Sequence, residues 1–365
     1  MRVAIIGGGP AGLALAAQLR NHDVEVFEEH PRLGLPRHCT SVVSPGTWEK
    51  LRGLAGNVGH RAFRTLVVGG SGRPLEVVFP EPFAYYVERP SLEERLAQRA
   101  ESLGHTVRLS TRAQIVGERV IKAGETSSRY DYVVVAEGAS GSHRELFYGR
   151  RAKFVAGIQW IARIGGIEDN TMYISYACRP FCLFGWAFAV DDGLGIAGFI
   201  VRRTTGSSRA LLRRTVEALG LSIRELLEPF GGPIPVEAPP SSPVPARWVA
   251  FIGDALPASK PYTGGGLASV VAMAGCLAKA IDMGNPGLYA RAYAALRARL
   301  VVEHALVKLL GRGHWIPLKL LGHVARRFPT VVDYDNHLVS GLRSAALLPL
   351  AGLDALARLI AGAGP

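Results

Sequence analysis

The sequence contains few of the residues that cross-link a chain or carry it through a membrane. Only four of its 365 residues are cysteine, and they form no CxxC pairs, so we expect a reducing, cytosolic setting with neither a disulfide framework nor a metal site. Pro349, Asp354 and Arg358 interrupt the final apolar stretch, and no membrane-spanning helix is predicted. No signal peptide is expected either, because Met1 and Arg2 lead directly into a strand-like run.

Low-complexity segments and internal repeats are also missing, which argues against a fibrous or solvated protein. Hydrophobic residues make up 48% of the chain, and its length predicts about two structural units. The net charge is +12, and from Arg291 to the end ten basic residues face only four acidic ones. This end is either a solvated helical face or a surface for peripheral contact with an anionic membrane. Nucleic-acid binding is not expected, since most of the basic residues are scattered arginines.

The N-terminal segment has the pattern of a dinucleotide-binding turn. An apolar run at Val3–Ile6 leads into the sequence GGGPAG and then into an apolar run of small residues, which predicts strand, turn and helix. Glycine at these positions allows a tight turn, close approach of a pyrophosphate, and close packing of the helix on the strand. The residues expected to bind the dinucleotide here are Gly7, Gly9, Ala11 and Gly12.

A second predicted strand, Val24–Glu28, ends in two acidic residues. Glu28 follows Gly7 by 21 positions, where a carboxylate accepts hydrogen bonds from the adenosine ribose. Glu29 is the alternative for this role, because the end of a strand is uncertain by a residue or two.

Three later segments also place polar or small residues after predicted strands. Tyr85–Val87 and Arg89 precede a predicted helix, with Ser91 and Glu94 spaced as its capping box and Gly104 placed to end it. The other two segments are the strand 131–136, followed by Gly138, and the strand 248–252, followed by Asp254 and a glycine-rich turn before a helix over 267–281. Ligands of open α/β sheets bind beyond the carboxyl ends of strands, so these segments can converge on one site.

Together these segments resemble the geranylgeranyl reductase family of FAD-dependent oxidoreductases, which have the p-hydroxybenzoate hydroxylase fold. The resemblance rests on GGGPAG at 7–12, the acid Glu28, Arg89, Ala136-Glu137-Gly138 and Gly253-Asp254. Residues 261–267, PYTGGGL, are more similar to the reductase pattern P-x-T-G-G-G-I than to the P-x-x-G-Q-G of hydroxylases. The resemblance implies an α/β protein with a Rossmann-like FAD-binding domain, an inserted α+β substrate domain and a helical C-terminal region.

For the cofactor, the resemblance implies that Asp254 binds the ribityl chain of FAD. It also implies that Arg89 and Gly138 belong to the FAD site, and that the backbone amides of Gly264, Gly265 and Gly266 face the flavin pyrimidine ring. Glycine there lets the backbone touch the ring, and the N-terminus of the following helix stabilises negative charge on the reduced flavin.

The segment around Trp186 and Phe188 resembles the substrate-domain motif of the family, W-x-F-P, although Ala189 replaces the proline. Aromatic side chains can line an apolar tunnel for a polyisoprenoid chain, and Gln159 is a further candidate for the pocket. Packing in the core of a sheet is the alternative for these side chains.

Cys39 lies in a segment that resembles the family's cysteine-containing loop. Its thiol can face the flavin or the substrate, where Arg37 and His38 would lower its pKa, or it can be an inert buried thiol. Reduction of an isolated C=C bond requires a proton donor, and Cys39, Tyr262 and water are the candidates.

The predicted activity is FAD-dependent saturation of C=C bonds in prenyl chains of isoprenoid lipids, with NAD(P)H or ferredoxin as electron donor. The alternatives are an FAD-dependent monooxygenase or halogenase of the same fold, and a noncatalytic flavin- or lipid-binding membrane adaptor. The expected FAD-binding segments are 1–60, 85–150 and 245–290. The expected substrate domain is 61–84 and 151–244. The helical C-terminal region is 291–365, with its helices interrupted at Pro317, Pro329 and Pro349.

Overall fold

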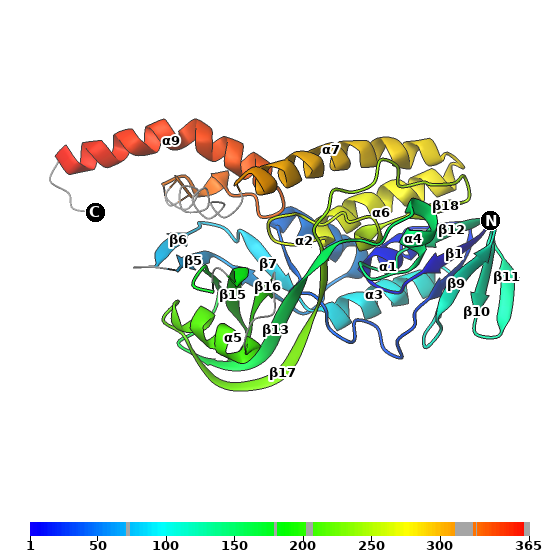
Figure 1. The fold of residues 1–365 in the computed structure, drawn as a ribbon, viewed down its shortest axis with the longest axis horizontal. Coiled ribbons are helices and arrows are strands. Elements are labelled where there is room, and N and C mark those ends of the chain that lie inside the picture. Colours follow the sequence, from blue (N-terminus) through cyan, green and yellow to red (C-terminus); the bar gives the residue numbers. More distant parts are fainter. Residues whose placement is uncertain (71–73, 179–180, 202–206, 311–323, 326, 361–365) are drawn as a thin grey trace. The chain divides into compact units, whose positions relative to one another are not determined.

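The computed structural model describes residues 1–70, 74–178, 181–201, 207–310, 324–325 and 327–360. The chain divides into two compact units, each assembled from three separate stretches (Figure 1). Unit 1 comprises residues 1–60, 86–157 and 231–305, and unit 2 comprises residues 61–85, 158–230 and 306–365. Residues 231–244 and 291–305, which the sequence analysis assigned to the substrate domain and the C-terminal region, are thus grouped with unit 1.

The centre of unit 1 is a parallel sheet of five strands. Its order is β18 (Val249–Phe251), β12 (Tyr132–Val135), β1 (Arg2–Ile6), β2 (Asp23–Phe27) and β8 (Thr106–Arg108). The central strands are apolar and almost wholly buried, as expected where both faces of a parallel sheet are covered. Because all five strands run the same way, their carboxyl ends lie along one edge of the sheet.

Helices of unit 1 pack on one another beside this sheet. Helix α1 (Pro10–Ala16) contacts α3 (Arg89–Ser102) and α6 (Leu267–Asp282), and α2 (Pro45–Ala55) contacts the same two helices. Gly12 brings α1 close to β1: a β-carbon built there would overlap the carbonyl oxygen of Gly7 and lie 3.0 Å from Ile5 Cγ2. Only glycine permits this approach, so the position of α1 depends on Gly12.

Helix α3 begins earlier than the sequence suggested. Its N-cap is Glu88, whose side chain accepts a hydrogen bond from the Ser91 amide at 2.8 Å. The predicted capping box of Ser91 with Glu94 is therefore wrong, because Pro90 fits the first turn of a helix and lets the helix start at Arg89. Gly104, with φ +86°, follows the end of the helix as predicted.

Smaller elements complete unit 1. Three antiparallel strands form a separate sheet near the N-terminus of the chain (Figure 1). They are β9 (Ala113–Gly117), β10 (Val120–Ala123) and β11 (Thr126–Arg129). This part also contains α4 (His143–Tyr148), the short helix η1 (Gly253–Ala255) and most of α7 (Pro286–Leu310). Another small sheet of the chain has the order β3 (Val42–Val43), β7 (Ala84–Val87) and β4 (His60–Phe63), and most of β4 is grouped with unit 2.

Unit 2 is built on a sheet of seven strands, with helix α5 (Ser208–Glu217) packed on β15 and β16. Its order is β17 (Ser222–Pro235), β13 (Phe154–Gly165), β16 (Leu194–Val201), β15 (Cys182–Asp191), β14 (Thr171–Ser175), β5 (Thr65–Gly69) and β6 (Leu75–Val78). The neighbours β13 and β17 are long strands that bend together (Figure 1). Phe63, Phe188 and Phe199 form part of a fully buried apolar core in this unit.

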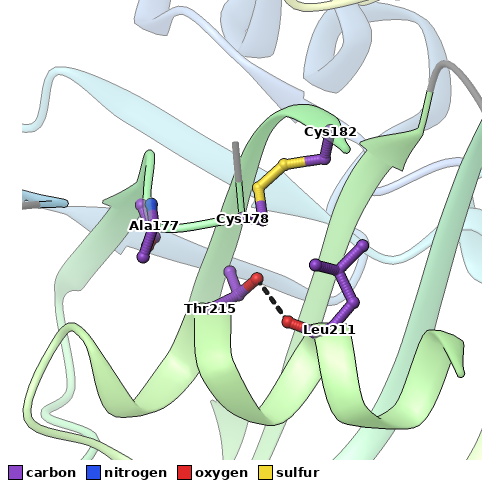
Figure 2. The surroundings of a disulfide bond; sticks show 6 residues. Ala177, Cys178, Cys182, Leu211 and Thr215 are labelled. Carbon is purple, nitrogen blue, oxygen red and sulfur yellow. Dashed lines mark hydrogen bonds between the residues drawn. A yellow bond between two sulfur atoms is a disulfide. The ribbon is translucent and has the colours of Figure 1, made fainter. Parts of the chain in front are cut away.

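A disulfide joins Cys178 to Cys182 at the start of β15 (Figure 2). The two Cα atoms are 5.5 Å apart, a normal separation for a disulfide. The bond lies beside α5, where Thr215 Oγ1 donates a hydrogen bond to the Leu211 carbonyl at 2.7 Å. The sequence analysis did not foresee this pairing, because the spacing of two cysteines does not determine the distance between them in the fold.

The C-terminal part contains a short helix, η3 (Pro329–Val331), and the long helix α9 (His337–Ile360). Pro349 lies inside α9 and does not interrupt it, contrary to the expectation from the sequence. Proline removes one backbone donor, and an exposed position such as this one tolerates that loss. Pro317 lies outside the described residues. Within the described ranges, no helix combines the length and the apolar composition needed to cross a membrane.

We expect Gly12→Ala to destabilise the protein by about 3 kcal/mol or more, because the new methyl group would overlap the Gly7 carbonyl oxygen. Gly53→Ala is the matched control, because Gly53 is exposed in α2 and nothing lies within 4 Å of a β-carbon built there. That control should gain about 0.5–1 kcal/mol. Urea unfolding of both variants measures the difference, and equal stabilities would contradict the close packing of α1 on β1.

Candidate active site

The glycine turn after β1 has open space around its backbone at Gly9. The Gly7 amide donates to the Phe27 carbonyl at 2.9 Å, which fixes the turn to the end of β2. Gly9 is the N-cap of α1, and no side chain caps it. Among the described residues, the nearest atom to a β-carbon built on Gly9 is Glu93 Oε1, at 3.9 Å. The turn therefore presents amides and open space rather than side chains, which is what a pyrophosphate requires.

Glu28 follows β2 and reaches back to this turn. Its Oε2 accepts the Gly8 amide at 2.8 Å, and its Oε1 accepts the His30 amide at 2.9 Å. Glu29 instead lies at the surface, 3.8 Å from Arg112. Of the two acids considered for the ribose, Glu28 is the one that lies against the glycine turn.

Arg89 forms a two-point ion pair with Glu93 within α3. The guanidinium donates from Nη2 to Glu93 Oε1 at 2.6 Å and from Nε to Oε2 at 3.2 Å. Burial acts to lower the pKa of Arg89, but the Glu93 carboxylate and the neighbouring Cys39 raise it overall. Arg89 is therefore a permanent cation in a buried setting.

Asp254 lies directly after β18 and joins this group. Gly253, with φ +69°, brings the backbone so close to α1 that a β-carbon on Gly253 would lie 2.9 Å from Ala11 Cβ. Burial raises the pKa of Asp254 to about 6, and the charge of Arg89 partly opposes that rise. The structure thus brings together three predicted residues from distant segments, namely Cys39, Arg89 and Asp254.

The turn before α6 folds against Asp254. Gly264 has φ +73°, and a β-carbon built on Gly266 would lie 3.0 Å from Asp254 Oδ1. The N-cap of α6 is Gly266, which has no side chain to cap the first amides of the helix. Thr263 Oγ1 is buried in the same turn without a hydrogen-bond partner in the described part of the chain. A bound ligand with several oxygen and nitrogen atoms would fit this arrangement.

Glu137 and His143 form a pair that the sequence analysis missed. Glu137 accepts the His143 amide at 2.8 Å and contacts His143 Nδ1 at 2.7 Å. The Ile115 amide donates to His143 Nε2 at 2.9 Å, so Nε2 is an acceptor and the ring proton lies on Nδ1. The pair braces the turn that contains Gly138, whose φ is +75° and which has open space around its α-carbon.

Cys39 is a free, partly exposed thiol whose Sγ accepts the Ser41 amide at 3.3 Å. The cations expected to act on it have other partners: Arg37 contacts Glu88 at 3.3 Å, and His38 Nδ1 contacts the Gly231 carbonyl at 3.0 Å. Arg89 takes their place beside the thiol, which sequence spacing could not indicate.

Tyr262 is the second candidate proton donor, and it lies in the turn before α6. Burial raises the pKa of Tyr262, and the nearby Glu303 carboxylate raises it further. The phenol therefore keeps its proton at neutral pH.

The three predicted substrate residues lie in the sheet of unit 2. Gln159 and Trp186 flank Gly198 so closely that a β-carbon there would lie 2.7 Å from Gln159 Cγ and 2.9 Å from Trp186 Cζ2. Phe188 is wholly buried, and its ring centre is 5.2 Å from that of Phe63. The indole Nε1 of Trp186 is buried without a hydrogen-bond partner among the residues that the structure describes.

The residues of unit 1 fit FAD. Amides and open space at Gly9 suit the pyrophosphate, Glu28 lies beside them for a ribose, and Asp254 offers a carboxylate for a hydroxylated chain. The uncapped start of α6 lies next to Asp254 and suits the electron-rich edge of a flavin.

Comparison with known proteins identifies the fold. A family model described as an NAD(P)-binding Rossmann-like domain matches residues 5–67, and no curated protein matches the sequence. A geranylgeranyl bacteriochlorophyll reductase-like protein from Thermoplasma acidophilum is similar in structure, with a TM-score of 0.74 and 17% identity. The likeness covers 94% of this chain and 95% of that one.

Two further structures that are similar to this chain belong to enzymes named for other reactions. The flavin-dependent halogenase CmlS has a TM-score of 0.64 at 20% identity, covering 90% of this chain and 65% of that one. The p-nitrophenol 4-monooxygenase PnpA from Pseudomonas putida DLL-E4 has a TM-score of 0.61 at 16% identity, covering 81% and 83%. These likenesses confirm the predicted α/β fold with a Rossmann-like domain, the fold of flavin-dependent oxidoreductases. One fold carries all three reactions, so it does not choose between them.

We expect the affinity for FAD to fall about tenfold for each pH unit below about pH 6. Asp254 has a pKa of about 6 without the cofactor, so below that pH it is protonated. FAD binding that depends on the charged carboxylate, a stronger hydrogen-bond acceptor than the neutral acid, must first remove that proton. Flavin fluorescence titrations between pH 5 and pH 8 measure this slope. Asp254→Asn should bind FAD more weakly and without the slope, whereas the exposed Asp191→Asn should behave as the wild type. A slope that survives in Asp254→Asn would show that another group is responsible.

Proposed function

We propose that this protein is an FAD-dependent reductase that saturates C=C bonds in the prenyl chains of isoprenoid lipids. The observation that carries the proposal is the cluster of Arg89, Cys39 and Asp254 beside a TGGG turn at the start of α6. The sequence of that turn is similar to the reductase pattern rather than to that of hydroxylases. The fold shared with a geranylgeranyl bacteriochlorophyll reductase-like protein supports the same proposed activity.

In this proposal, backbone amides and two acidic side chains bind the FAD. The amides near Gly9 bind the pyrophosphate, Glu28 the adenosine ribose and Asp254 the ribityl chain. The amides of residues 264–266 face the pyrimidine ring, and Gly138 leaves room for the cofactor. Arg89 holds this arrangement together, because its charge acts on both Cys39 and Asp254.

Bound FAD, once reduced by the electron donor, would supply two electrons as hydride to one carbon of the double bond. The protein must supply a proton to the other carbon, because an isolated alkene has no carbonyl group to hold a negative charge. We favour Cys39 over Tyr262 as the donor, since its thiol is partly exposed while burial and Glu303 hold the proton of Tyr262 more tightly. Arg89 beside the thiol stabilises the thiolate that remains.

The proposal assigns the lipid chain to unit 2. Trp186, Phe188 and Gln159 contribute to its binding, with the aromatic side chains excluding water from the apolar chain. NAD(P)H or ferredoxin is the electron donor. The basic C-terminal end gives peripheral contact with a membrane that carries the lipid, in a protein of the cytosol.

Reduced, FAD-loaded protein incubated with geranylgeranyl lipids should yield products heavier by two hydrogens for each double bond reduced. Mass spectrometry of the extracted lipid measures this gain. A product heavier by one oxygen, formed only in air, would instead support a monooxygenase, the activity of the related fold in PnpA. Bound flavin that neither NAD(P)H nor reduced ferredoxin can reduce would support a noncatalytic flavin- or lipid-binding adaptor.

Replacement of the proposed proton donor should slow the chemical step alone. We expect Cys39→Ala to lower the rate of flavin reoxidation by the lipid about 100-fold, while FAD binding and flavin reduction stay unchanged. Cys276→Ala is the matched control, because Cys276 is the other free cysteine and lies in α6. Stopped-flow absorbance separates the two half-reactions. If Tyr262→Phe reproduced the loss and Cys39→Ala did not, Tyr262 would be the donor.

A further inference from the structure

Lys260 is a buried cation that the proposed reaction does not use. It is 1% exposed and belongs to the largest fully buried side chains in the described residues. Its backbone closes the turn before α6: the Lys260 amide donates to the Gly265 carbonyl at 3.0 Å, and the Lys260 carbonyl accepts the Gly264 amide at 2.8 Å. Lys260 therefore lies at the base of the turn that the proposal places against the flavin.

The side chain of Lys260 folds back onto this turn. A β-carbon built on Gly265 would lie 2.8 Å from Lys260 Cε and 3.2 Å from its Nζ. The absence of a side chain at Gly265 thus makes room for the ammonium group. Because the side chain is almost wholly buried, little water can screen the charge of its ammonium group.

The turn and its surroundings contain a small set of charged groups. Asp254 Oδ1 lies against Gly266, and the buried Glu303 carboxylate acts on Tyr262. The charge of Arg89 also acts on Asp254, where it partly opposes the rise in pKa that burial causes. Of these charged groups, the Lys260 side chain is the one that packs on Gly265, the middle glycine of the turn.

We propose that Lys260 is a positioning residue that holds a positive charge behind the Gly264–Gly266 turn and so makes the bound flavin easier to reduce. This inference rests on the proposed function, in which the pyrimidine edge of FAD faces the amides of this turn. Negative charge gathers at N1 and O2 of a flavin when it accepts electrons. In a site with little water, a fixed cation behind the turn stabilises that charge more than solvent would.

Sulfite binding tests the inference without turnover. The sulfur lone pair of sulfite adds to N5 of oxidised flavin, and the flavin takes up the electron pair as negative charge at N1 and O2. Sulfite affinity therefore reports how well the protein stabilises charge at that edge, and absorbance at the flavin band measures it. The variants are Lys260→Met, which removes the charge at similar length, and Lys260→Arg, which keeps it. Lys279→Met is the matched control, because Lys279 is exposed in the last turn of α6.

We expect the sulfite dissociation constant to rise about tenfold in Lys260→Met, which corresponds to a midpoint potential lower by about 30 mV for a two-electron couple. Lys260→Arg and Lys279→Met should stay close to the wild type. Redox titration of the same samples gives an independent reading of the shift. If Lys260→Met does not fold, Lys260→Gln takes its place as a neutral variant that keeps a hydrogen-bond donor.

The outcomes separate the two proposals. A wild-type protein that takes up no FAD would overturn the proposed function before sulfite is added. FAD bound fully in all variants, with sulfite affinity and midpoint potential unchanged in Lys260→Met, would overturn the role of Lys260 and leave the proposed function standing. Loss of folding in both neutral variants would also overturn it, because Lys260 would then be a requirement of the structure.

Discussion

The buried ion pair between Arg89 and Glu93 is the interaction on which the candidate site depends. It holds a cation whose charge interacts both with Cys39 and with Asp254. Loss of one partner would leave an uncompensated charge among buried groups, a change that commonly costs about 3–5 kcal/mol. The geometry of Arg89 is set within α3, since Glu93 is one helical turn further along. Cys39 and Asp254, which are far apart in the sequence, thus both interact with a cation that is positioned by a pair within one helix.

Much of unit 1 could be predicted from the sequence because its signals are local. The apolar run of β1, the glycines after it and the acid at the end of β2 each have a direct physical meaning. The structure has the predicted strand, turn and helix there, with Glu28 against the turn. The start of α6 at Leu267 was predicted in the same way, from glycines followed by a long apolar segment. These features depend on residues that are neighbours in the chain.

Features that depend on distance in space could not be predicted. The sequence analysis assigned Arg37 and His38 to Cys39 because they are adjacent, whereas the fold brings Arg89 there from another strand–helix connection. The pair of Glu137 and His143 was missed for a similar reason. The His143 ring is held between Glu137 and an amide of β9, a strand that is distant from it in the sequence. The Cys178–Cys182 bond and the N-cap at Glu88 also depend on geometry that spacing does not encode.

The order of strands in unit 1 has a consequence for synthesis on the ribosome. Strand β1 is made first, but its neighbour β12 begins at Tyr132 and the edge strand β18 at Val249. The nascent chain must therefore keep apolar strands from pairing wrongly until most of its length has emerged. Such long-range pairing makes folding slow, and unpaired strand edges are prone to aggregation. We expect truncated nascent chains that end before β18 to need chaperones, even though the first strand, turn and helix are already complete.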